Sequence, residues 1–397
     1  MNKKHLVVIC GQYYPTMSPT GRCAERYALL FRDEYDIDFI SESQDGQEQR
    51  VTMPNGITSY TASCRRVTLE KRAKGNIRKV LHSLGSLLLF TNYLGNQRWY
   101  RKAALRQLEI IHKEKPVDVV WSICSPMAAI CAGADFKKIH PEVRVCSYTV
   151  DPFSTPDRVR PILHSRKEML AFEQKMLVGM DSVLLSEEVY NARPELRETI
   201  PACRPLPYLM PSFEVSKNKP EEGEVLVGVY AGSFYEKIRN PRFMLDVLSR
   251  LNRNTFKLVL YSKGCESVVG EYANVDNIEQ HGLITPTQLA EEYRKADILI
   301  GVGNSVSDFL PSKTFEYIAQ GKPIVFFNYK GHDSKELEIH PLALQLTDDI
   351  PVEAACTRLL EFCERVKIEN IKEEELASLY SKHSPSNIKQ IIKEAFN

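Results

Sequence analysis

The chain has 397 residues, of which 43% are hydrophobic and 26% charged, and its formal net charge is +1. This composition argues against a disordered chain, and the small net charge argues against a protein that binds nucleic acid through an overall positive charge. At about 150 residues per domain, the length corresponds to two or three domains. The ten cysteines include no Cys-x-x-Cys pair, which is typical of reduced structural thiols in a cytoplasmic protein.

The first half of the chain contains short runs of valine, isoleucine and leucine. Such continuous apolar runs predict buried parallel strands. We expect these strands at His5–Cys10, Asp36–Ser41, Val117–Ile123, Arg144–Val150 and Ser182–Ser186. The longer stretches between them predict helices at Arg22–Arg32, Asn96–Lys115 and Arg166–Met176.

The second half repeats this alternation of strands and helices. Its strands are expected at Val225–Ala231, Lys257–Ser262, Ile278–His281, Ile298–Val302 and Pro323–Asn328. Its helices are expected at Pro241–Asn252, Thr287–Lys295 and Ser312–Gln320, and a last amphipathic helix at Ser386–Phe396. Strands and helices in alternation predict a parallel sheet with helices on both faces.

A proline-rich stretch at Pro201–Gly223 divides the two halves and has the composition of a linker. The sequence therefore predicts an α/β protein of two doubly wound, Rossmann-like domains that face each other across a cleft. The expected boundaries are residues 1–205 for the first domain, 206–221 for a hinge, 222–380 for the second domain and 381–397 for a helix that returns to the first. Ligands of such sheets bind beyond the carboxyl ends of the strands, so functional residues are expected directly after strands.

The segment Gly301–Val325 carries the strongest chemical signal. A strand and a Gly/Asn/Ser loop lead to Ser312, a suitable N-cap, and to Lys313 in the first turn of a helix. Free N–H groups at a helix start bind anions, and Lys313 adds positive charge beside them. Glu316 is placed to accept hydrogen bonds from a diol such as a ribose. The residues alone fit a nucleotide diphosphate site or merely a well-capped helix in which Glu316 favours the helix dipole.

This segment resembles the signature of retaining GT-B glycosyltransferases of family 4, which has a carboxylate, seven residues and a glutamate within a Pro-Ser-Lys-x-x-Glu run. Here the pair is Asp308 and Glu316, with Pro311, Ser312 and Lys313 in place. Asp308 stands where glutamate is usual, so a contact with the donor sugar is expected to be altered. The resemblance implies that Glu316 contacts the ribose, Lys313 and the Ser312 helix start hold the diphosphate, and no metal ion takes part.

A second match lies at Val229–Leu251, where a strand, a Gly232 turn and a basic loop precede a helix. The resemblance implies that Arg239 holds the diphosphate, with Lys237 as a weaker candidate that is otherwise a solvated loop charge. Ser233 stands where the family often has a basic residue. After the next strands, Leu283 and Ile284 are expected either to meet the nucleotide base or to serve in packing.

In the first domain, Gly21 matches a family glycine that lets the backbone approach the donor and acceptor, whereas Arg22 departs from the pattern. The Arg22 side chain binds an anion or points into solvent. Asp151 follows a predicted strand and is either an acceptor contact or a cap of the loop before Pro152. Arg239, Lys313 and Asp308 are thus the predicted catalytic residues, and Gly21, Arg22 and Asp151 are the predicted acceptor side.

The segment Arg65–Lys79 carries seven basic residues against one glutamate, and an apolar stretch follows it. Basic charge beside apolar residues suits an anionic membrane surface, although charge runs are also common on solvated helices.

The resemblance implies a metal-independent, retaining glycosyltransferase, which we expect in the cytoplasm or on the inner face of a bacterial membrane. It uses a nucleotide-diphosphate sugar as donor and needs no cofactor. The expected acceptor is a glycan or lipid-linked sugar in surface polysaccharide assembly, and nucleic acid is not an expected partner. Two alternatives remain open, a non-catalytic partner subunit of the same fold and a sugar-nucleotide epimerase.

Overall fold

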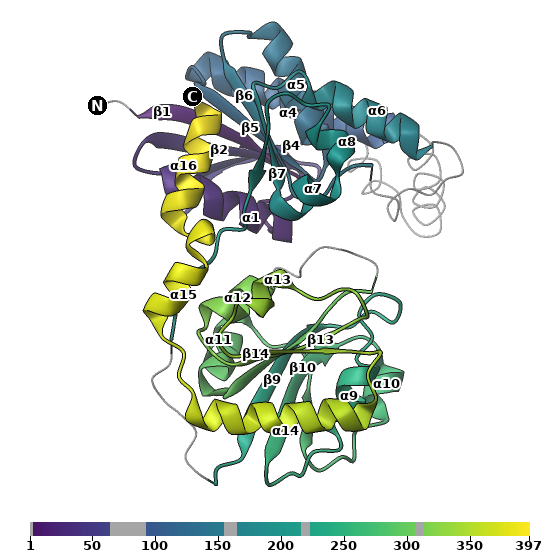
Figure 1. Ribbon diagram of the computed structural model, residues 1–397. Helices are drawn as coiled ribbons and strands as arrows, with labels where there is room; N and C mark the ends of the chain where they lie inside the picture. Colours follow the sequence, from purple (N-terminus) through teal and green to yellow (C-terminus); the bar gives the residue numbers. More distant parts are fainter. Residues whose placement is uncertain (1–2, 64–92, 155–164, 216–222, 306–312) are drawn as a thin grey trace. The chain divides into compact units, whose positions relative to one another are not determined.

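The computed structural model describes residues 3–63, 93–154, 165–215, 223–305 and 313–397 (Figure 1). The chain divides into two compact units, one formed by Met1–Leu209 with Pro385–Asn397 and the other by Met210–Ser384. Each unit is built on a largely parallel sheet with helices on both of its faces, which confirms the predicted fold class. Among the described residues, no helix combines the length and the apolar character needed to cross a membrane.

The first domain contains an eight-stranded sheet in the order β3-β4-β2-β1-β5-β6-β7-β8, parallel except for the pairing of β3 with β4. Its strands are β1 (Lys4–Ile9), β2 (Tyr35–Glu42), β3 (Arg50–Thr52), β4 (Thr58–Ala62), β5 (Val119–Cys124), β6 (Arg144–Thr149), β7 (Ser182–Ser186) and β8 (Cys203–Leu206). The central strands are buried along their length, as expected for a parallel sheet covered on both faces.

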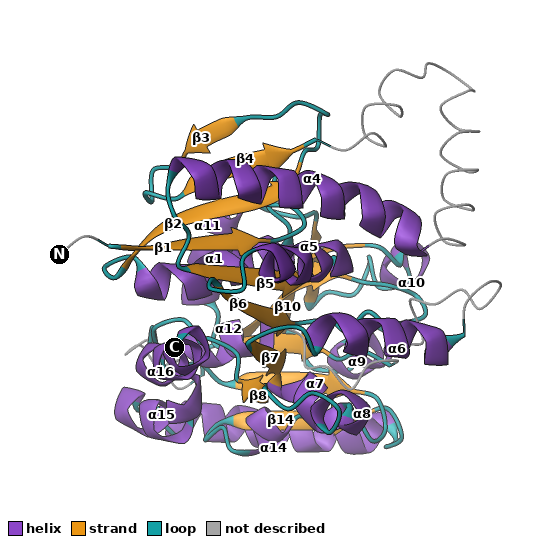
Figure 2. Ribbon diagram, turned by 90° about the horizontal axis from the view of Figure 1, so that it is seen from above, coloured by secondary structure: helices purple, strands orange, loops and turns teal. Residues whose placement is uncertain are grey.

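The described residues of the first domain form seven α-helices and a 3₁₀ turn (Figure 2). They are α1 (Pro19–Ala28), η1 (Leu29–Phe31), α4 (Tyr93–Glu114), α5 (Met127–Ile139), α6 (Arg166–Leu177), α7 (Glu187–Ala192), α8 (Pro194–Arg197) and α16 (Pro385–Phe396). The last helix packs on the first-domain sheet, where Phe396 contacts the rings of Phe31 and Trp121 at centroid distances of 5.2 and 5.4 Å. Helix α16 therefore belongs to the core of the first domain.

The second domain contains a six-stranded, fully parallel sheet in the order β11-β10-β9-β12-β13-β14. Its strands are β9 (Leu226–Ser233), β10 (Phe256–Lys263), β11 (Ile278–His281), β12 (Ile298–Val302), β13 (Ile324–Asn328) and β14 (Ala343–Thr347). Its helices are α9 (Arg242–Leu248), α10 (Glu266–Gly270), α11 (Pro286–Lys295), α12 (Lys313–Ala319), α13 (Lys335–Glu338), α14 (Val352–Ile368) and α15 (Glu373–Leu379), with a 3₁₀ turn η3 (Ser381–His383). The strand order reverses between β9 and β12, which is where ligands bind in sheets of this kind.

Candidate functional site

The carboxyl ends of β9 and β12 carry the best-defined group of polar residues in the second domain. Arg239, in the loop after β9, donates from Nε and Nη2 to the Oδ1 atom of Asn304 at 3.1 and 2.9 Å. Asn304 follows β12, so this contact joins the two loops that flank the reversal of strand order. The side chain of Arg239 is thereby oriented by a neutral oxygen.

Backbone contacts fix the loop that carries Arg239. The N–H of Arg239 donates to the Tyr235 carbonyl at 2.7 Å, which closes a tight turn. Ser305 holds this turn to the β12 loop, because its N–H donates to the Ile238 carbonyl and its hydroxyl to the Lys237 carbonyl, each at 2.8 Å. The guanidinium is therefore carried on a loop that is attached at both ends to a rigid sheet.

Lys313 opens α12 and its Nζ donates to the carbonyl oxygen of Ala231 in β9. Burial lowers the pKa of Lys313, an effect that the nearby Glu316 carboxylate opposes and the Arg239 guanidinium reinforces. Lys313, Glu316 and Arg239 are therefore close enough for their charges to interact. Within the described ranges, neither Arg239 nor Lys313 forms an ion pair with a carboxylate.

Tyr230 lies under this group and was not singled out from the sequence. Burial raises the pKa of its phenol, and the neighbouring Arg239 partly offsets this rise. Gly232 and Ser233 end β9 beside it, and a Cβ atom on Gly232 would come within 3.0 Å of the Tyr230 hydroxyl. The Tyr230 side chain thus packs closely against the predicted turn at Gly232.

The loops after β9 and β10 approach each other closely at Gly264. Its φ of +85° favours glycine, and a Cβ atom there would lie 2.4 Å from the Phe234 carbonyl oxygen. Beside this contact, a pocket of about 360 Å³ lies at the carboxyl ends of β10 and β11. Its lining includes Lys263, Glu266, Gln280, His281 and Gly282.

Leu283 and Ile284, the predicted base contacts, follow this pocket without lining it. Leu283 is 53% exposed and Ile284 is half-buried, so neither belongs to the core. The pocket is lined by the neighbouring Gly282 instead. Asp308 and Ser312, which complete the predicted donor site, lie outside the described residues, as does the basic segment Arg65–Lys79.

The predicted acceptor residues follow strands of the first domain. Helix α1 begins at Pro19, three residues before the predicted start at Arg22, and Ser18 caps it by accepting from the Gly21 N–H at 3.1 Å. A Cβ atom on Gly21 would lie 2.2 Å from the Gln12 carbonyl oxygen, so this position requires glycine. The Arg22 side chain is exposed, and Asp151 is half-buried directly after β6.

A buried carboxylate that the sequence did not reveal holds the Asp151 loop. Glu173 of α6 is fully buried and accepts from the Phe153 N–H at 2.7 Å and from the N–H and hydroxyl of Ser154 at 3.2 and 2.6 Å. Arg193 donates to the Ser154 hydroxyl at 2.7 Å. These contacts fix the backbone two residues beyond Asp151.

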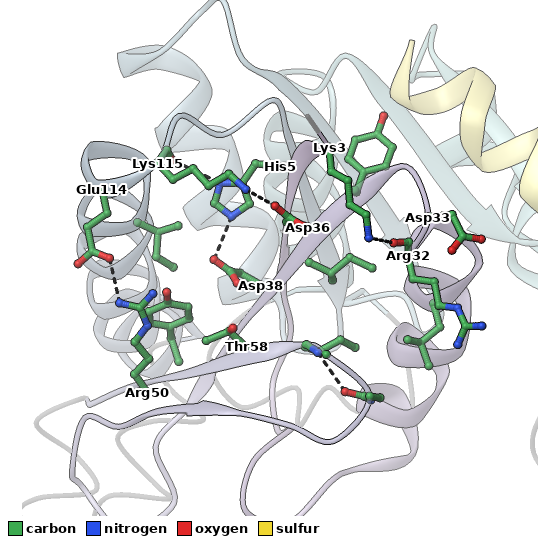
Figure 3. A pocket seen from close by; sticks show the side chains of 18 residues that line it. Lys3, His5, Arg32, Asp33, Asp36, Asp38, Arg50, Thr58, Glu114 and Lys115 are labelled. Atoms are coloured by element: carbon green, nitrogen blue, oxygen red, sulfur yellow. Dashed lines mark hydrogen bonds and ion pairs between the residues drawn. The ribbon is translucent and has the colours of Figure 1, made fainter. Parts of the chain in front are cut away.

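A separate pocket of about 630 Å³ lies at the amino ends of β1, β2 and β4 in the first domain (Figure 3). Its charged side chains largely pair with one another, as in Asp36 with Lys115 and Arg50 with Glu114. None of the predicted site residues lines it, and it lies at the opposite edge of the sheet from Gly21 and Asp151. This pocket is therefore not the predicted acceptor site.

Comparisons with known proteins concern the fold and the second domain. Residues 226–361 match the family model described as Glycosyl transferases group 1. A sucrose-phosphate synthase from Thermosynechococcus elongatus superposes with a TM-score of 0.67 at 12% identity, over 99% of this chain and 98% of that one. No curated protein sequence gives a significant match.

Two further solved structures share the architecture. A trehalose 6-phosphate synthase from Burkholderia multivorans has a TM-score of 0.61 at 14% identity, over 100% of this chain and 98% of its own. The lipopolysaccharide outer core galactosyltransferase WaaB has a TM-score of 0.59 at 11% identity, over 98% of both chains. The chain therefore has the GT-B fold, and residues 226–361, which lie within its second domain, match the group 1 glycosyl transferase model.

Proposed function

We propose that this GT-B glycosyltransferase moves a sugar from a nucleotide-diphosphate sugar to an acceptor with retention of anomeric configuration and without a metal ion. The observation that carries the proposal is the convergence of Arg239 and Lys313 where the strand order reverses, each held by a neutral oxygen. A diphosphate supplies the ion-pair partner that neither cation has among the described residues. Arginine and lysine at such a point bind phosphate strongly.

In the proposed reaction, the bond between the anomeric carbon and the diphosphate oxygen breaks while the acceptor oxygen bonds to the same carbon. The acceptor proton passes to the leaving diphosphate. Arg239 and Lys313 stabilise the negative charge that develops on this leaving group, which is commonly the largest contribution to catalysis. Glu316, one turn after Lys313, accepts from the ribose hydroxyls, and Asp308 contacts the donor sugar.

The proposed acceptor is a lipid-linked or growing glycan in the assembly of a surface polysaccharide. Two features support this: the basic segment Arg65–Lys79, which suits an anionic membrane surface, and the structural likeness to WaaB, whose name refers to the lipopolysaccharide outer core. Gly21, Arg22 and Asp151 form the proposed acceptor side. Co-sedimentation with anionic liposomes at low salt tests the membrane contact, and a protein that stays in the supernatant contradicts it.

The donor site is tested by a thermal-shift panel of UDP-, GDP-, dTDP-, ADP- and CMP-sugars in the presence of EDTA. A ligand that binds only the folded protein raises its melting temperature, so one nucleotide family is expected to do so. Arg239→Ala and Glu316→Ala are expected to abolish or reduce this shift. Arg250→Ala is the matched control, because Arg250 is an exposed arginine paired with Glu353 and follows α9, away from the carboxyl ends of the strands.

The outcomes of this panel separate the alternatives. A shift that survives in both variants contradicts the residue assignment while leaving nucleotide binding intact. The absence of any shift favours the non-catalytic partner, since a donor-binding enzyme must respond to its own nucleotide.

A further inference from the structure

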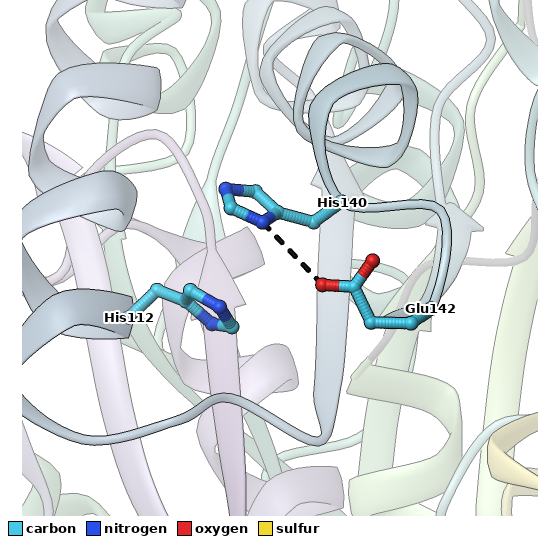
Figure 4. A group of neighbouring side chains, drawn as sticks. All are labelled: His112, His140 and Glu142. Atoms are coloured by element: carbon cyan, nitrogen blue, oxygen red, sulfur yellow. Dashed lines mark ion pairs between the residues drawn. The ribbon is translucent and has the colours of Figure 1, made fainter.

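Two histidines and a glutamate gather at the amino ends of β5 and β6, away from every residue assigned above (Figure 4). His112 lies in the last turn of α4, His140 caps the end of α5, and Glu142 lies in the connection from α5 to β6. Both histidines are half-buried and Glu142 is exposed. The predicted acceptor residues Gly21 and Asp151 lie at the other edge of this sheet, after the carboxyl ends of β1 and β6.

The orientation of His140 is that of a metal ligand. Its Nε2 atom lies 3.0 Å from Glu109 Oε1. A carboxylate only accepts hydrogen bonds, so Nε2 carries the hydrogen and a neutral ring presents its lone pair at Nδ1. Metal-binding histidines commonly donate their other N–H to a carboxylate in this way, which fixes the ring.

The distance across the cluster fits a tetrahedral ion. His140 Nδ1 lies 3.5 Å from Glu142 Oε1, which is too long for a well-formed hydrogen bond. A zinc ion with bonds of about 2.1 Å to nitrogen and to oxygen holds two such atoms about 3.4 Å apart in tetrahedral geometry. His140 and Glu142 therefore already have the separation that zinc requires.

His112 supplies the third ligand after a small movement. The ligand atoms of the three side chains all lie within 4.8 Å of one another, and the two imidazole rings are 4.5 Å apart between centroids. His112 Nδ1 accepts from the Val117 N–H at 3.1 Å. Because a metal-bound ring donates from its second nitrogen, binding costs His112 this hydrogen bond and makes it the weakest of the three ligands.

The surrounding charges also suit a cation. The cluster lies at the carboxyl-terminal ends of α4 and α5, where helix dipoles are negative. The two lysines in the last turn of α5 are neutralised, since Lys137 pairs with Asp181 at 2.8 Å and Lys138 with Asp135 at 3.2 Å. Two imidazoles and a carboxylate form a ligand set that zinc prefers.

We propose that His112, His140 and Glu142 bind one Zn²⁺ ion, which links the end of α4 to the segment that enters β6 and stabilises the first domain. The remaining coordination position is open to water. This proposal is independent of the transfer reaction, because the site lies at the opposite edge of the first-domain sheet from the predicted acceptor loops.

The test is calorimetric titration of the EDTA-treated, desalted full chain with ZnCl₂, together with its melting temperature with and without the ion. We expect one site and a higher melting temperature with zinc. His140→Ala and Glu142→Gln should each lower the affinity at least about tenfold, and Glu109→Gln about tenfold through loss of the hydrogen bond to His140. His112→Ala should cause a smaller but measurable loss.

Two controls make the test specific. Glu114→Gln removes a carboxylate from the same helix, and His332→Ala removes a half-buried histidine from the other domain; both should bind zinc as the unmodified chain does. Melting temperatures in EDTA show whether each variant is folded. Unchanged affinity in the His140, Glu142 or His112 variant overturns the three-residue site, as does the absence of any zinc binding. A thiolate charge-transfer band in the Co²⁺-loaded protein also overturns it, because it would place the ion on cysteine.

Discussion

Two pairs of partly buried cations differ in the groups that hold them. In the first domain, Arg101 binds Asp135 through two contacts of 2.5 and 2.6 Å, and Arg193 binds Glu195 at 2.6 Å. At the carboxyl edge of the second sheet, Arg239 is held by an amide oxygen and Lys313 by a backbone carbonyl. Arg101 and Arg193 are therefore neutralised by carboxylates, whereas Arg239 and Lys313 are oriented by neutral oxygens.

This difference separates a structural cation from one that is available to a ligand. A cation paired with a carboxylate has its charge compensated within the fold, and adding a phosphate there gains little. A cation held by a neutral oxygen keeps its charge while losing the freedom of its side chain, so less entropy is lost when an anion binds. The four predictions below test this distinction, beginning with the largest expected effect.

Glu173→Gln tests whether the charges of the first domain are structural. The replacement presents an amide to three donors that now meet a buried carboxylate, so we expect a loss of about 3 kcal/mol in the free energy of unfolding. Urea denaturation followed by circular dichroism measures it. Glu198→Gln, on a side chain that is 71% exposed, is the control and should change stability by less than about 0.5 kcal/mol. If both variants lose the same amount of stability, the hydrogen bonds to the buried Glu173 carboxylate contribute no more to stability than an exposed carboxylate does.

Lys313→Met is expected to lower nucleotide affinity without lowering stability, in contrast to Glu173→Gln. Burial lowers the pKa of Lys313, which means that the charged form is held in the fold at a cost, so an apolar side chain of similar length should leave stability unchanged or higher. Nucleotide affinity should fall on the order of 100-fold, because a charge-assisted contact to phosphate is lost. Titration of the variant with the nucleotide that stabilises the unmodified chain provides the comparison. A destabilised variant with normal affinity would assign Lys313 to the core instead.

Much of the second sheet follows from the sequence, and the exceptions have physical causes. The runs at Ile278–His281 and Ile298–Val302 form strands with those boundaries. The edge strand β14 was not predicted, because Ala343–Thr347 is only half-buried and carries a glutamine. Helix α5 was also missed, since Met127–Ile139 is buried nearly all round and lacks the polar face that reveals an amphipathic helix.

The candidate site divides in the same way. Arg239 and Lys313 were predicted because they match basic positions of the family 4 signature, and Lys313 also lies at a helix start. Asn304 was not, because its role depends on a contact with a side chain 65 positions away. In the sequence, Glu173 is indistinguishable from an exposed helix residue, because its burial depends on the contact with Ser154 in the loop after β6. Partners of this kind are set by tertiary structure, and a single sequence carries no signal for them.

His340 extends the comparison to a buried group that has no charged partner in the described part of the chain. Its Nδ1 accepts from the Leu342 N–H at 3.2 Å, and burial lowers its pKa from 6.5 to about 4. Because the unfolded chain binds the proton more readily, stability is full above pH 6.5 and falls as the pH drops toward 4. When the pH falls from 7.5 to 5, His340 should lower the free energy of unfolding by about 2 kcal/mol.

Urea denaturation at the two pH values measures this loss in the unmodified chain and in His340→Asn, which keeps an acceptor for the Leu342 N–H. For each protein, the free energy of unfolding at pH 7.5 is subtracted from that at pH 5. The unmodified chain should lose more stability over this range than His340→Asn does. The same pH dependence in both would mean that another group titrates in this range.

Asn304→Asp replaces the neutral oxygen beside Arg239 with a carboxylate, so that Arg239 is paired as Arg101 and Arg193 are in the first domain. The new carboxylate would keep the geometry of Asn304 Oδ1 and pair with Arg239 at the present distances of 2.9 and 3.1 Å. The fold should be retained or slightly more stable, because a half-buried arginine gains a charged partner. Nucleotide affinity should fall about tenfold, since the diphosphate now meets a neutralised guanidinium and an added negative charge.

The matched control is Asn252→Asp, which adds the same charge in the loop before β10, at the amino edge of the sheet. It lies away from Arg239 and should bind the nucleotide as the unmodified chain does. If Asn304→Asp binds normally, Arg239 does not contact the diphosphate and the neutral oxygen beside it has no functional meaning. If both variants lose affinity equally, the effect comes from net charge. Loss in Asn304→Asp alone shows that a cation must lack a carboxylate partner to serve the donor.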